Sequence, residues 1–383
     1  MPGVSGMVTS VRGLAEGLVA SGNDVSLACP DSIEARHWAC RVGVDLHPLP
    51  AVTLPARISQ RSVIPVPNMR KRIWPAVVGA DIVHLHSPFL IRRAVVRCAH
   101  ERDIPIVATC HALPANVLGA LRLDGARLKR TSSFLMRRIC CELEAADVIV
   151  SPSKFAAQHL TNQCGRLDVR VISNGVKINT RAVPLRHGAV NRDGHVRALY
   201  VGRLQREKRV DELIRGICAA QLDGTDVCLT IVGTGPDEKR LRRITQRIPT
   251  RHVRFVGHLT DEALAETYGE STVFCMASRA ELQCCAALEA MAAGLPVVAA
   301  RAAALPETVA DGIAGRLYDP GNVREFASII TGLAHDDSNY QSLSTGARAT
   351  ARSHSLDESC TKMLALYQAT MKLGQSTQEM QPT

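Results

Sequence analysis

The stretch AELQCCAALEAMAAGLPVVAA, residues 280–300, decides how the C-terminal half of this chain folds. Residues 286–293 are strong helix formers, Gly294 ends the helix, and Pro296 prevents the helix from restarting. The apolar residues 297–300 then predict a short buried strand. A helix that leads directly into a buried strand is typical of a parallel α/β sheet.

Two carboxylates in this stretch, Glu281 and Glu289, stand eight positions apart. This spacing is slightly more than two helical turns, so both side chains can lie near one face at the N-terminal side of the helix. Carboxylates beside the free N–H groups of a helix start suit a polyhydroxylated ligand better than a hydrophobic core. The alternative is a pair of exposed glutamates on a surface helix.

Composition limits the classes of protein. A chain of 383 residues is long enough for two domains with full cores. Aromatic residues make up only 3%, which argues against a nucleic-acid platform of stacked rings. The net charge of +10 lies almost wholly in residues 1–180, which hold 22 Lys and Arg against 13 Asp and Glu, whereas the remainder holds 24 against 23. We expect an anionic membrane surface as partner and no nucleic acid; a merely solvated basic surface is the alternative.

Cysteine usage and hydropathy indicate the compartment. The 13 cysteines include no C-x-x-C pair, and no apolar run reaches transmembrane length. The N-terminus carries no signal peptide. These features predict reduced, mostly buried thiols in a cytoplasmic protein, peripheral on the inner face of the membrane.

Strands and helices alternate in the N-terminal half. The glycine-rich loop PGVSG, residues 2–6, leads into a helix over 7–20, an arrangement that cradles phosphate. Such a loop normally follows a strand, but this sequence opens at the loop, so the first strand of the sheet is expected to be missing. Further strands are predicted over 24–28, 81–85, 104–109, 147–150 and 169–172.

A polar, glycine-containing segment, residues 185–195, interrupts the alternation and predicts a linker. The alternation then resumes in the C-terminal half, where strands are predicted over 198–201, 228–232, 253–256, 273–276 and 297–300. Parallel strands separated by helices predict a doubly wound sheet, with functional groups where the strands end. The tail, residues 374–383, is rich in Gln, Ser and Thr and is predicted to be disordered.

Two cations follow the first strand of the C-terminal half. The sequence GRLQREK, residues 202–208, places Arg203 and Lys208 ahead of a helix N-terminus, where they can neutralise a diphosphate without a metal ion. The later sequence GTGP, residues 233–236, lacks the third glycine of a dinucleotide fingerprint, which argues against a nicotinamide cofactor.

The ordered motifs of both halves resemble those of the family 4 glycosyltransferases. The N-terminal set is PxxSG at 2–6, DIVHLHSP at 81–88, PIVATCH at 105–111, ADVIVSPS at 146–153 and VISNGV at 171–176. The C-terminal set is YVGRLxxEK at 200–208, IVGxGP at 231–236, FVGHL at 255–259 and the two glutamates at 281 and 289, followed by AMAAGLPVV. The resemblance covers about residues 1–372.

This resemblance implies an α/β protein of the GT-B fold, with two facing Rossmann-like domains and an interdomain cleft. Residues 1–184 are then an acceptor-binding domain, 185–195 the linker, and 196–356 the nucleotide-sugar-binding domain. Residues 357–373 form a helix that crosses back to the N-terminal domain, ahead of the tail at 374–383. The activity implied is the transfer of a hexose from a nucleotide-sugar with retention of anomeric configuration.

Carried over residue by residue, the resemblance implies a donor site in the C-terminal domain. Arg203 and Lys208 would grip the diphosphate, Glu281 would lie near the donor sugar, and Glu289 would accept hydrogen bonds from the ribose. Backbone groups would complete the site: Leu282, Gln283 and Cys284 at the sugar or phosphate, and Gly257, His258 and Leu259 at the base. UDP- or GDP-sugar is the expected co-substrate, with no metal and no further cofactor.

In the N-terminal domain the resemblance assigns His111 to the donor sugar and the transferred carbon, and Gly6 to a loop that approaches donor and acceptor. His111 thus joins Arg203, Lys208 and Glu281 as a catalytic candidate. His84 and His86 lie on the same side of a strand, where packing is favoured over metal binding.

One further motif indicates the class of acceptor. GxVTSVR, residues 6–12, resembles the branch that glycosylates diacylglycerol or phosphatidylinositol, and with the basic N-terminal half it predicts a membrane-lipid acceptor. A soluble polysaccharide or natural-product acceptor is the alternative within the enzyme class, and a non-catalytic GT-B partner protein is the alternative outside it. LQCC at 282–285 replaces the family's commoner aromatic-glycine sequence, so the donor sugar stays open.

Overall fold

Short apolar strands alternate with helices along the chain, and the structure, a computed structural model, gathers them into two α/β units. It describes residues 6–53, 61–64, 66–86, 91–112, 114, 125–165, 168–178, 188–190, 194–250 and 252–379. Unit 1 holds the described residues up to 114, those of 125–175 and those from 356 onward, and unit 2 holds those of 176–355.

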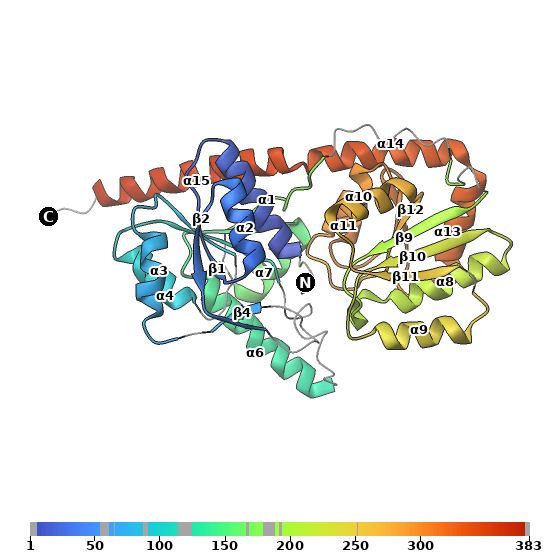
Figure 1. Ribbon diagram of the computed structural model, residues 1–383, viewed down its shortest axis with the longest axis horizontal. Coiled ribbons are helices and arrows are strands. Elements are labelled where there is room, and N and C mark those ends of the chain that lie inside the picture. Colours follow the sequence, from blue (N-terminus) through green and yellow to red (C-terminus); the bar gives the residue numbers. More distant parts are fainter. Residues whose placement is uncertain are drawn as a thin grey trace. The chain divides into compact units, whose positions relative to one another are not determined.

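Unit 2 is a doubly wound sheet of six parallel strands in the order β11-β10-β9-β12-β13-β14 (Figure 1). Its strands are β9 (Val196–Val201), β10 (Val227–Val232), β11 (Val253–Gly257), β12 (Val273–Met276), β13 (Val297–Ala300) and β14 (Gly315–Tyr318). The order reverses between β9 and β12, and loops that leave the carboxyl ends of such neighbours open a crevice for a ligand.

Helices cover both faces of this sheet, with α10, α11 and α14 on one side and α8 and α9 on the other (Figure 1), while α13 packs against α8. They are α8 (Val210–Leu222), α9 (Glu238–Arg247), α10 (Asp261–Glu270), α11 (Cys285–Ala292), α12 (Leu305–Val309), α13 (Val323–His335) and α14 (Asp337–Ser353), with a short 3-10 helix η1 (Arg206–Lys208). Because both faces are covered, the central strands are buried on both sides and read as continuous apolar runs.

Unit 1 is built on a sheet of four parallel strands in the order β5-β6-β7-β8. A parallel pair β1-β2 and an antiparallel hairpin β3-β4 complete its strands. These strands are β1 (Ser26–Pro30), β2 (Asp45–Leu49), β3 (Ala51–Thr53), β4 (Arg61–Val63), β5 (Val83–Leu85), β6 (Ile106–Thr109), β7 (Val148–Ser151) and β8 (Val169–Val171).

The pair β1-β2 and the four-stranded sheet are not hydrogen-bonded to each other in the described part of the chain. Apolar packing connects the two sheets instead, since Ala28 of β1 and Leu85 of β5 belong to one cluster around Ile73 of α3.

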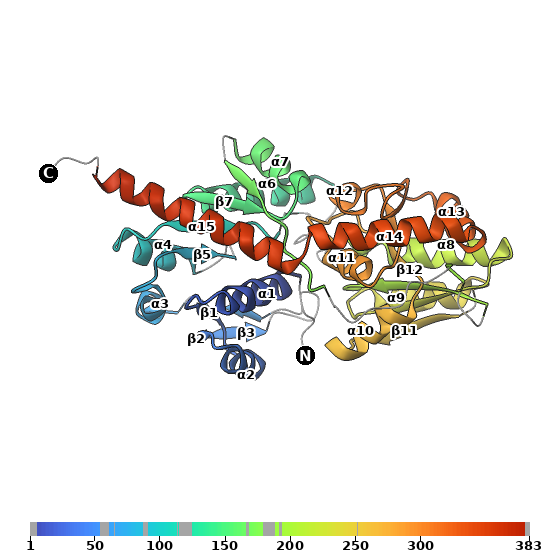
Figure 2. The same cartoon turned by 90° about the horizontal axis from the view of Figure 1, so that it is seen from above.

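Two helices from opposite ends of the sequence lie side by side in unit 1: α1 and α15 (Figures 1 and 2). Leu14, Cys360 and Met363 share a core with Val150 of β7. A side chain at Gly17 would meet the Cys360 sulfur at 2.3 Å, so this glycine permits the close approach. The helices are α1 (Gly6–Ala20), α2 (Ile33–Val42), α3 (Met69–Val77), α4 (Arg92–His100), α6 (Gly125–Leu143), α7 (Lys154–Cys164) and α15 (Leu356–Glu379).

Three segments differ from the predicted domain boundaries. Val176, expected in the N-terminal domain, is buried in the core of unit 2, and its N–H donates to the His354 carbonyl. Within the predicted linker, Ala189 is fully buried in the same core, while 185–187 and 191–193 lie outside the described residues. Helix α15 continues to Glu379, past the predicted start of a disordered tail at Gly374, because Gln and Glu favour helix and one glycine costs only about 1 kcal/mol; residues 380–383 lie outside the described residues.

The prediction that the cysteines are reduced is wrong for one pair. Cys140 of α6 and Cys164 of α7 form a disulfide across a sequence separation of 24 residues. The two helices pack against each other, and this brings together two residues that no spacing pattern connects. The other 11 cysteines are free thiols.

Candidate active site

The strand-order reversal in unit 2 places two of the predicted site loops next to each other. Arg203 and Lys208 follow β9, and Glu281 follows β12, its neighbour in the sheet. Lys208 Nζ donates to Glu281 Oε1 at 2.6 Å, so the pair spans the reversal point. Their motifs lie more than 70 residues apart in the sequence, and the structure brings them together.

The Lys208–Glu281 pair is largely buried, with side-chain exposures of 14% and 10%. Burial disfavours the ammonium, but the charge and hydrogen bond of Glu281 outweigh it and raise the pKa of Lys208 above its usual value. The Arg203 guanidinium acts in the opposite direction to Glu281 and lowers the pKa of Lys208. Lys208 therefore carries its positive charge at neutral pH.

A buried hydrogen bond and close backbone packing fix the loop that carries Arg203. The hydroxyl of the fully buried Tyr200 donates to the Arg203 carbonyl at 2.9 Å. A side chain at Gly233 would lie 2.0 Å from the Gly202 carbonyl oxygen, and one at Gly235 would lie 2.2 Å from that of Leu204. The glycines of GTGP thus serve close backbone packing between the loops after β9 and β10.

The two glutamates do not share a helix face. Helix α11 begins at Cys285, so Glu281 lies in the loop before it and Glu289 in its second turn. The expectation fails because Leu282, Gln283 and Cys284 are buried in a non-helical approach to the helix. Glu289 is partly exposed and accepts a hydrogen bond from the Tyr268 hydroxyl at 2.9 Å.

The segment predicted to meet the base, residues 257–259, begins at the last residue of β11. Gly257 has φ +73° and its carbonyl accepts from the Gly233 N–H at 2.7 Å. Leu259 packs against the core of unit 2, and the His258 side chain is exposed. This left-handed turn is the reason that glycine stands at this position.

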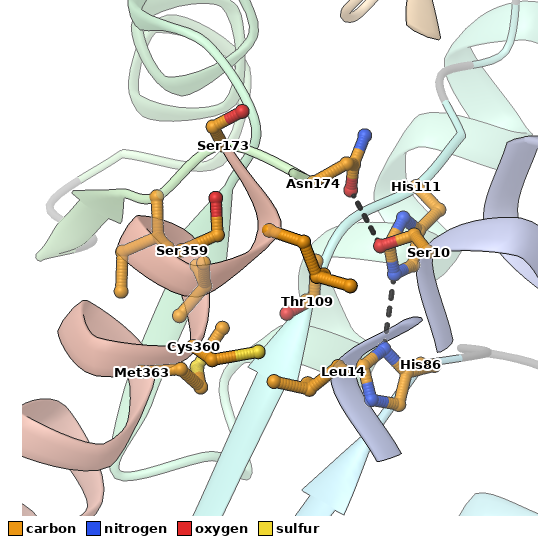
Figure 3. A pocket seen from close by; sticks show the side chains of 13 residues that line it. Ser10, Leu14, His86, Thr109, His111, Ser173, Asn174, Ser359, Cys360 and Met363 are labelled. Atoms are coloured by element: carbon orange, nitrogen blue, oxygen red, sulfur yellow. Dashed lines mark hydrogen bonds between the residues drawn. The ribbon is translucent and has the colours of Figure 1, made fainter. Parts of the chain in front are cut away.

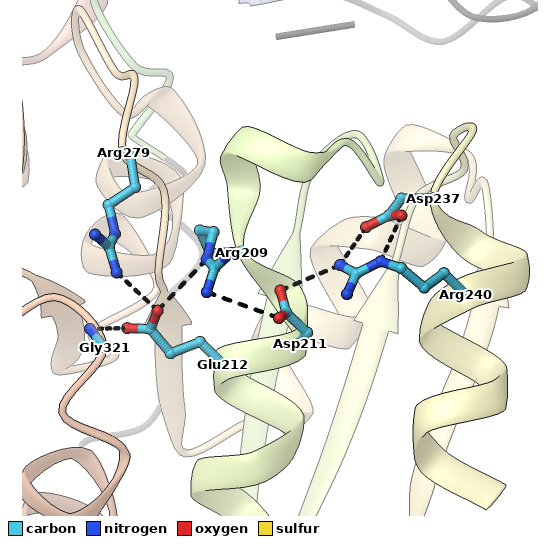
Figure 4. Close-up of polar contacts among 7 residues, drawn as sticks. All are labelled: Arg209, Asp211, Glu212, Asp237, Arg240, Arg279 and Gly321. Atoms are coloured by element: carbon cyan, nitrogen blue, oxygen red, sulfur yellow. Dashed lines mark hydrogen bonds and ion pairs between the residues drawn. The ribbon is translucent and has the colours of Figure 1, made fainter. Parts of the chain in front are cut away.

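Ion pairs that the sequence analysis did not identify connect the loops of unit 2 (Figure 4). Glu212, 3% exposed in the first turn of α8, accepts from Arg279 at 2.9 Å and from the Gly321 N–H at 2.8 Å. Its neighbour Asp211, 4% exposed, pairs with Arg240 at 3.3 Å. Arg279 stands two positions before Glu281, so a buried carboxylate of α8 fixes the loop that holds Glu281.

Arg240 extends this set of ion pairs to a further loop. Its guanidinium binds both oxygens of Asp237, at 2.8 and 2.6 Å, in the loop after β10. Arg209 lies between Asp211 and Glu212, at 3.8 and 3.7 Å. The adjacent acids at 211 and 212, in the first turn of a largely apolar helix, were the available sign in the sequence, but apart from Arg209 their partners come from α9 and from the loops after β12 and β14.

Unit 1 presents a small pocket, lined by both polar and apolar side chains, where its parallel strands end (Figure 3). His111 follows β6, and its Nε2 lies 3.0 Å from Nδ1 of His86, which follows β5. Ser10 of α1, which also lines the pocket, donates to the Asn174 side-chain oxygen at 3.0 Å. Gly6 is exposed at the start of α1, and residues 2–5 of its loop lie outside the described residues.

His84 stands beneath this pocket, on the same side of the strand as His86, with ring centroids 3.9 Å apart. It contacts the Tyr367 hydroxyl at 2.5 Å and the Thr109 hydroxyl at 2.7 Å. Burial lowers the pKa of His84 to about 3 and that of His111 to about 4. Among the described residues no group of His, Cys, Asp and Glu has a geometry that could hold a metal ion.

No helix in the described part of the chain combines the length and apolar character needed to span a membrane.

Two family models together match most of the chain. "Glycosyltransferase Family 4" matches residues 4–180, and "Glycosyl transferases group 1" matches residues 186–350. Among curated proteins, a GDP-mannose-dependent alpha-mannosyltransferase of Mycolicibacterium smegmatis is 30% identical over 83% of this chain and 82% of its own length. One of the same name from Corynebacterium glutamicum is 27% identical over 98% of this chain and 88% of its own length.

Solved structures agree on the fold. Anabaena Alr3699/HepE in complex with UDP matches with a TM-score of 0.74 at 16% identity, over 96% of this chain and 98% of that one. The sucrose-phosphate synthase of Thermosynechococcus elongatus matches with a TM-score of 0.71 at 19% identity, over 97% and 94%. These likenesses show the GT-B fold, with two Rossmann-like units. The sequence matches show that this chain belongs to the family 4 glycosyltransferases, enzymes that transfer a sugar from a nucleotide-sugar donor.

Proposed function

We propose that this protein is a retaining, metal-independent mannosyltransferase that moves mannose from GDP-mannose to a membrane-lipid acceptor. The observation that carries the proposal is the buried Lys208–Glu281 pair beside Arg203, at the point where the strand order of unit 2 reverses. The names of the two curated relatives support GDP-mannose as the donor.

In this proposal the cations bind the diphosphate. An ammonium has three N–H donors, and Glu281 takes one of those on Lys208, which leaves two for phosphate oxygens. Glu281 cancels the charge of Lys208, so Arg203 supplies the net positive charge that stabilises the departing GDP. These fixed cations take the role that a metal ion has in other transferases, and we therefore expect chelators to leave turnover unchanged.

The remaining groups bind the mannose, the ribose and the base of the donor. Glu281 Oε2 accepts a hydrogen bond from a mannose hydroxyl, and Glu289 accepts from the ribose. Backbone groups of Leu282, Gln283 and Cys284 meet the sugar or phosphate, and those of Gly257, His258 and Leu259 meet the base. Gly6 and His111 contact donor and acceptor; burial keeps the pKa of His111 at about 4, so it hydrogen-bonds a sugar hydroxyl as a neutral imidazole.

Helix α6 supports a membrane-lipid acceptor. Arg130, Phe134, Arg137 and Arg138 are exposed at spacings that share one helix face, and Phe134 is 61% exposed. A row of arginines with an exposed aromatic ring suits the headgroup region of an anionic bilayer. We propose that this face of α6 meets the membrane from which the lipid acceptor is taken.

One assay tests donor and acceptor together: nucleotide release from a panel of UDP- and GDP-sugars, with and without anionic liposomes that contain diacylglycerol and phosphatidylinositol. We expect release from GDP-mannose that depends on lipid, survives EDTA and falls about a hundredfold or more in Arg203→Ala. Phe134→Ser should weaken the lipid dependence, whereas Leu222→Ser, at a position 69% exposed on α8, should not.

Each part of the proposal has its own contrary result. Release from GDP-mannose without lipid dependence would favour a soluble acceptor. Release from a UDP-sugar alone would overturn the donor, and unchanged turnover in Arg203→Ala would overturn the diphosphate assignment. No release from any donor, by a folded protein, would favour a non-catalytic GT-B partner.

A further inference from the structure

We propose that Tyr268 is the positioning residue of the ribose site: its hydroxyl holds one oxygen of Glu289, so that the other oxygen faces the nucleotide. This inference rests on the proposed function, in which Glu289 binds the ribose. The two residues come from different elements, Tyr268 from the last turns of α10 and Glu289 from the second turn of α11. Their side chains meet at 2.9 Å, between the tyrosine hydroxyl and Glu289 Oε2.

The phenol has a single proton, and two acceptors lie within reach. One is Glu289 Oε2 and the other is the Ala286 carbonyl oxygen, at 3.2 Å. Hydrogen bonds to an ionised acceptor are shorter and about twice as strong as those to a neutral one, so the proton goes to the carboxylate. Tyr268 is 5% exposed, and water therefore competes poorly for its hydroxyl.

Glu289 depends on this contact. Within the described part of the chain, Oε2 is bonded to Tyr268 and no protein group donates to Oε1. Burial raises the pKa of Glu289, the hydrogen bond from Tyr268 lowers it, and the Asp261 carboxylate raises it further. Tyr268 therefore keeps an acceptor available in a place where burial favours a carboxylic acid, and ribose hydroxyls need an acceptor.

The ring and the hydroxyl of Tyr268 can be separated experimentally. The ring packs near Phe274, with centroids 6.4 Å apart, and Tyr268→Phe keeps that packing while removing the hydroxyl. Tyr340 offers a matched control in the same unit. It is fully buried and its hydroxyl donates at 2.8 Å to the Thr272 carbonyl, so Tyr340→Phe also removes a buried hydrogen bond but leaves Glu289 untouched.

The experiment measures how each variant binds nucleotides with and without their ribose hydroxyls. Titration calorimetry on the full chain measures the affinities of GDP, UDP and their 2′,3′-dideoxy forms for the native protein, Tyr268→Phe, Tyr340→Phe and Glu289→Gln. For the native protein we expect the ribose hydroxyls to contribute about tenfold to a hundredfold in affinity, the range of a hydrogen bond to a charged group. Tyr268→Phe should lose most of that factor for the natural nucleotide and bind the dideoxy form as the native protein does.

The ratio between the natural and the dideoxy nucleotide separates the possible results. If Tyr268→Phe weakens both ligands equally, or keeps the native ratio while Glu289→Gln abolishes it, Tyr268 is only structural and the inference is overturned. If the native protein binds both forms equally, or binds neither, the ribose role in the proposed function fails, and this inference fails with it. Tyr340→Phe should keep the native ratio, because its lost hydrogen bond does not reach the site.

Discussion

Arg209 combines a strained backbone conformation with a side chain that forms stabilising ion pairs. It joins η1 to α8 at φ 51° and ψ 35°, a left-handed conformation that costs a side chain about 1 kcal/mol relative to glycine. Its guanidinium, with the side chain 44% exposed, lies 3.8 and 3.7 Å from the buried acids Asp211 and Glu212. The same residue thus strains the backbone and helps to neutralise two buried carboxylates.

Two substitutions separate these effects. Arg209→Ala and Arg209→Gly both remove the guanidinium, but only alanine keeps the backbone strain. We expect the alanine variant to be less stable than the glycine variant by about 1 kcal/mol, or about 2–4 °C in the unfolding midpoint of unit 2. Thermal unfolding followed by circular dichroism measures the difference. Equal midpoints would show that the loop relaxes out of the left-handed region.

Among the elements, a disulfide joins α6 and α7, the helices that precede and follow β7 in the sequence. It closes a loop of 24 residues and thereby restricts the unfolded chain. We expect reduction to destabilise unit 1 by about 3 kcal/mol and to lower its unfolding midpoint by several degrees. Scanning calorimetry with and without dithiothreitol measures this shift.

The control for this prediction is the double variant Cys140→Ala with Cys164→Ala. It should unfold at the midpoint of the reduced native protein and should not respond to dithiothreitol, because the other cysteines are free thiols. A response of the same size in the double variant would contradict the assignment of the effect to this disulfide.

The stability of the whole molecule should depend on pH through the three histidines of unit 1. Burial lowers the pKa of His84 to about 3 and of His111 to about 4, and places that of His86 well below its usual value. Below the unfolded value of about 6.5, the unfolded chain binds more protons than the folded one. This contribution to stability is therefore complete above about pH 6.5 and is lost as pH falls, by up to about 1.4 kcal/mol per pH unit for each imidazole.

Thermal unfolding between pH 7.5 and 5 tests the prediction. The unfolding midpoint of unit 1 should fall as the pH falls. His84→Gln should make this dependence on pH weaker by the contribution of one imidazole, since glutamine does not titrate. Glu289 and Glu207 in unit 2 have raised pKa values, caused first by burial, and act in the opposite direction. An unchanged slope in His84→Gln would contradict the histidine assignment.

The α/β alternation, the GT-B fold, the family and most of the strands could be predicted from the sequence alone. The strands 273–276 and 297–300 are found where they were predicted, because a fully buried strand must be a continuous apolar run between turn residues. The sequence also identified Arg203, Lys208, Glu281 and Glu289 as candidates, through the motifs that carry them and the family resemblance of those motifs. Their roles in binding the donor remain predictions.

Which of these residues contact one another could not be predicted without the three-dimensional structure. The Lys208–Glu281 pair, the Tyr268–Glu289 contact, the Cys140–Cys164 disulfide and the buried acids of α8 each join segments that are far apart in the sequence. Local patterns specify helices and strands through near neighbours, whereas these contacts depend on strand order and helix packing. For the same reason Val176 lies in unit 2 and not in the predicted N-terminal domain: its burial depends on the core that it contacts and not on its neighbours in the sequence.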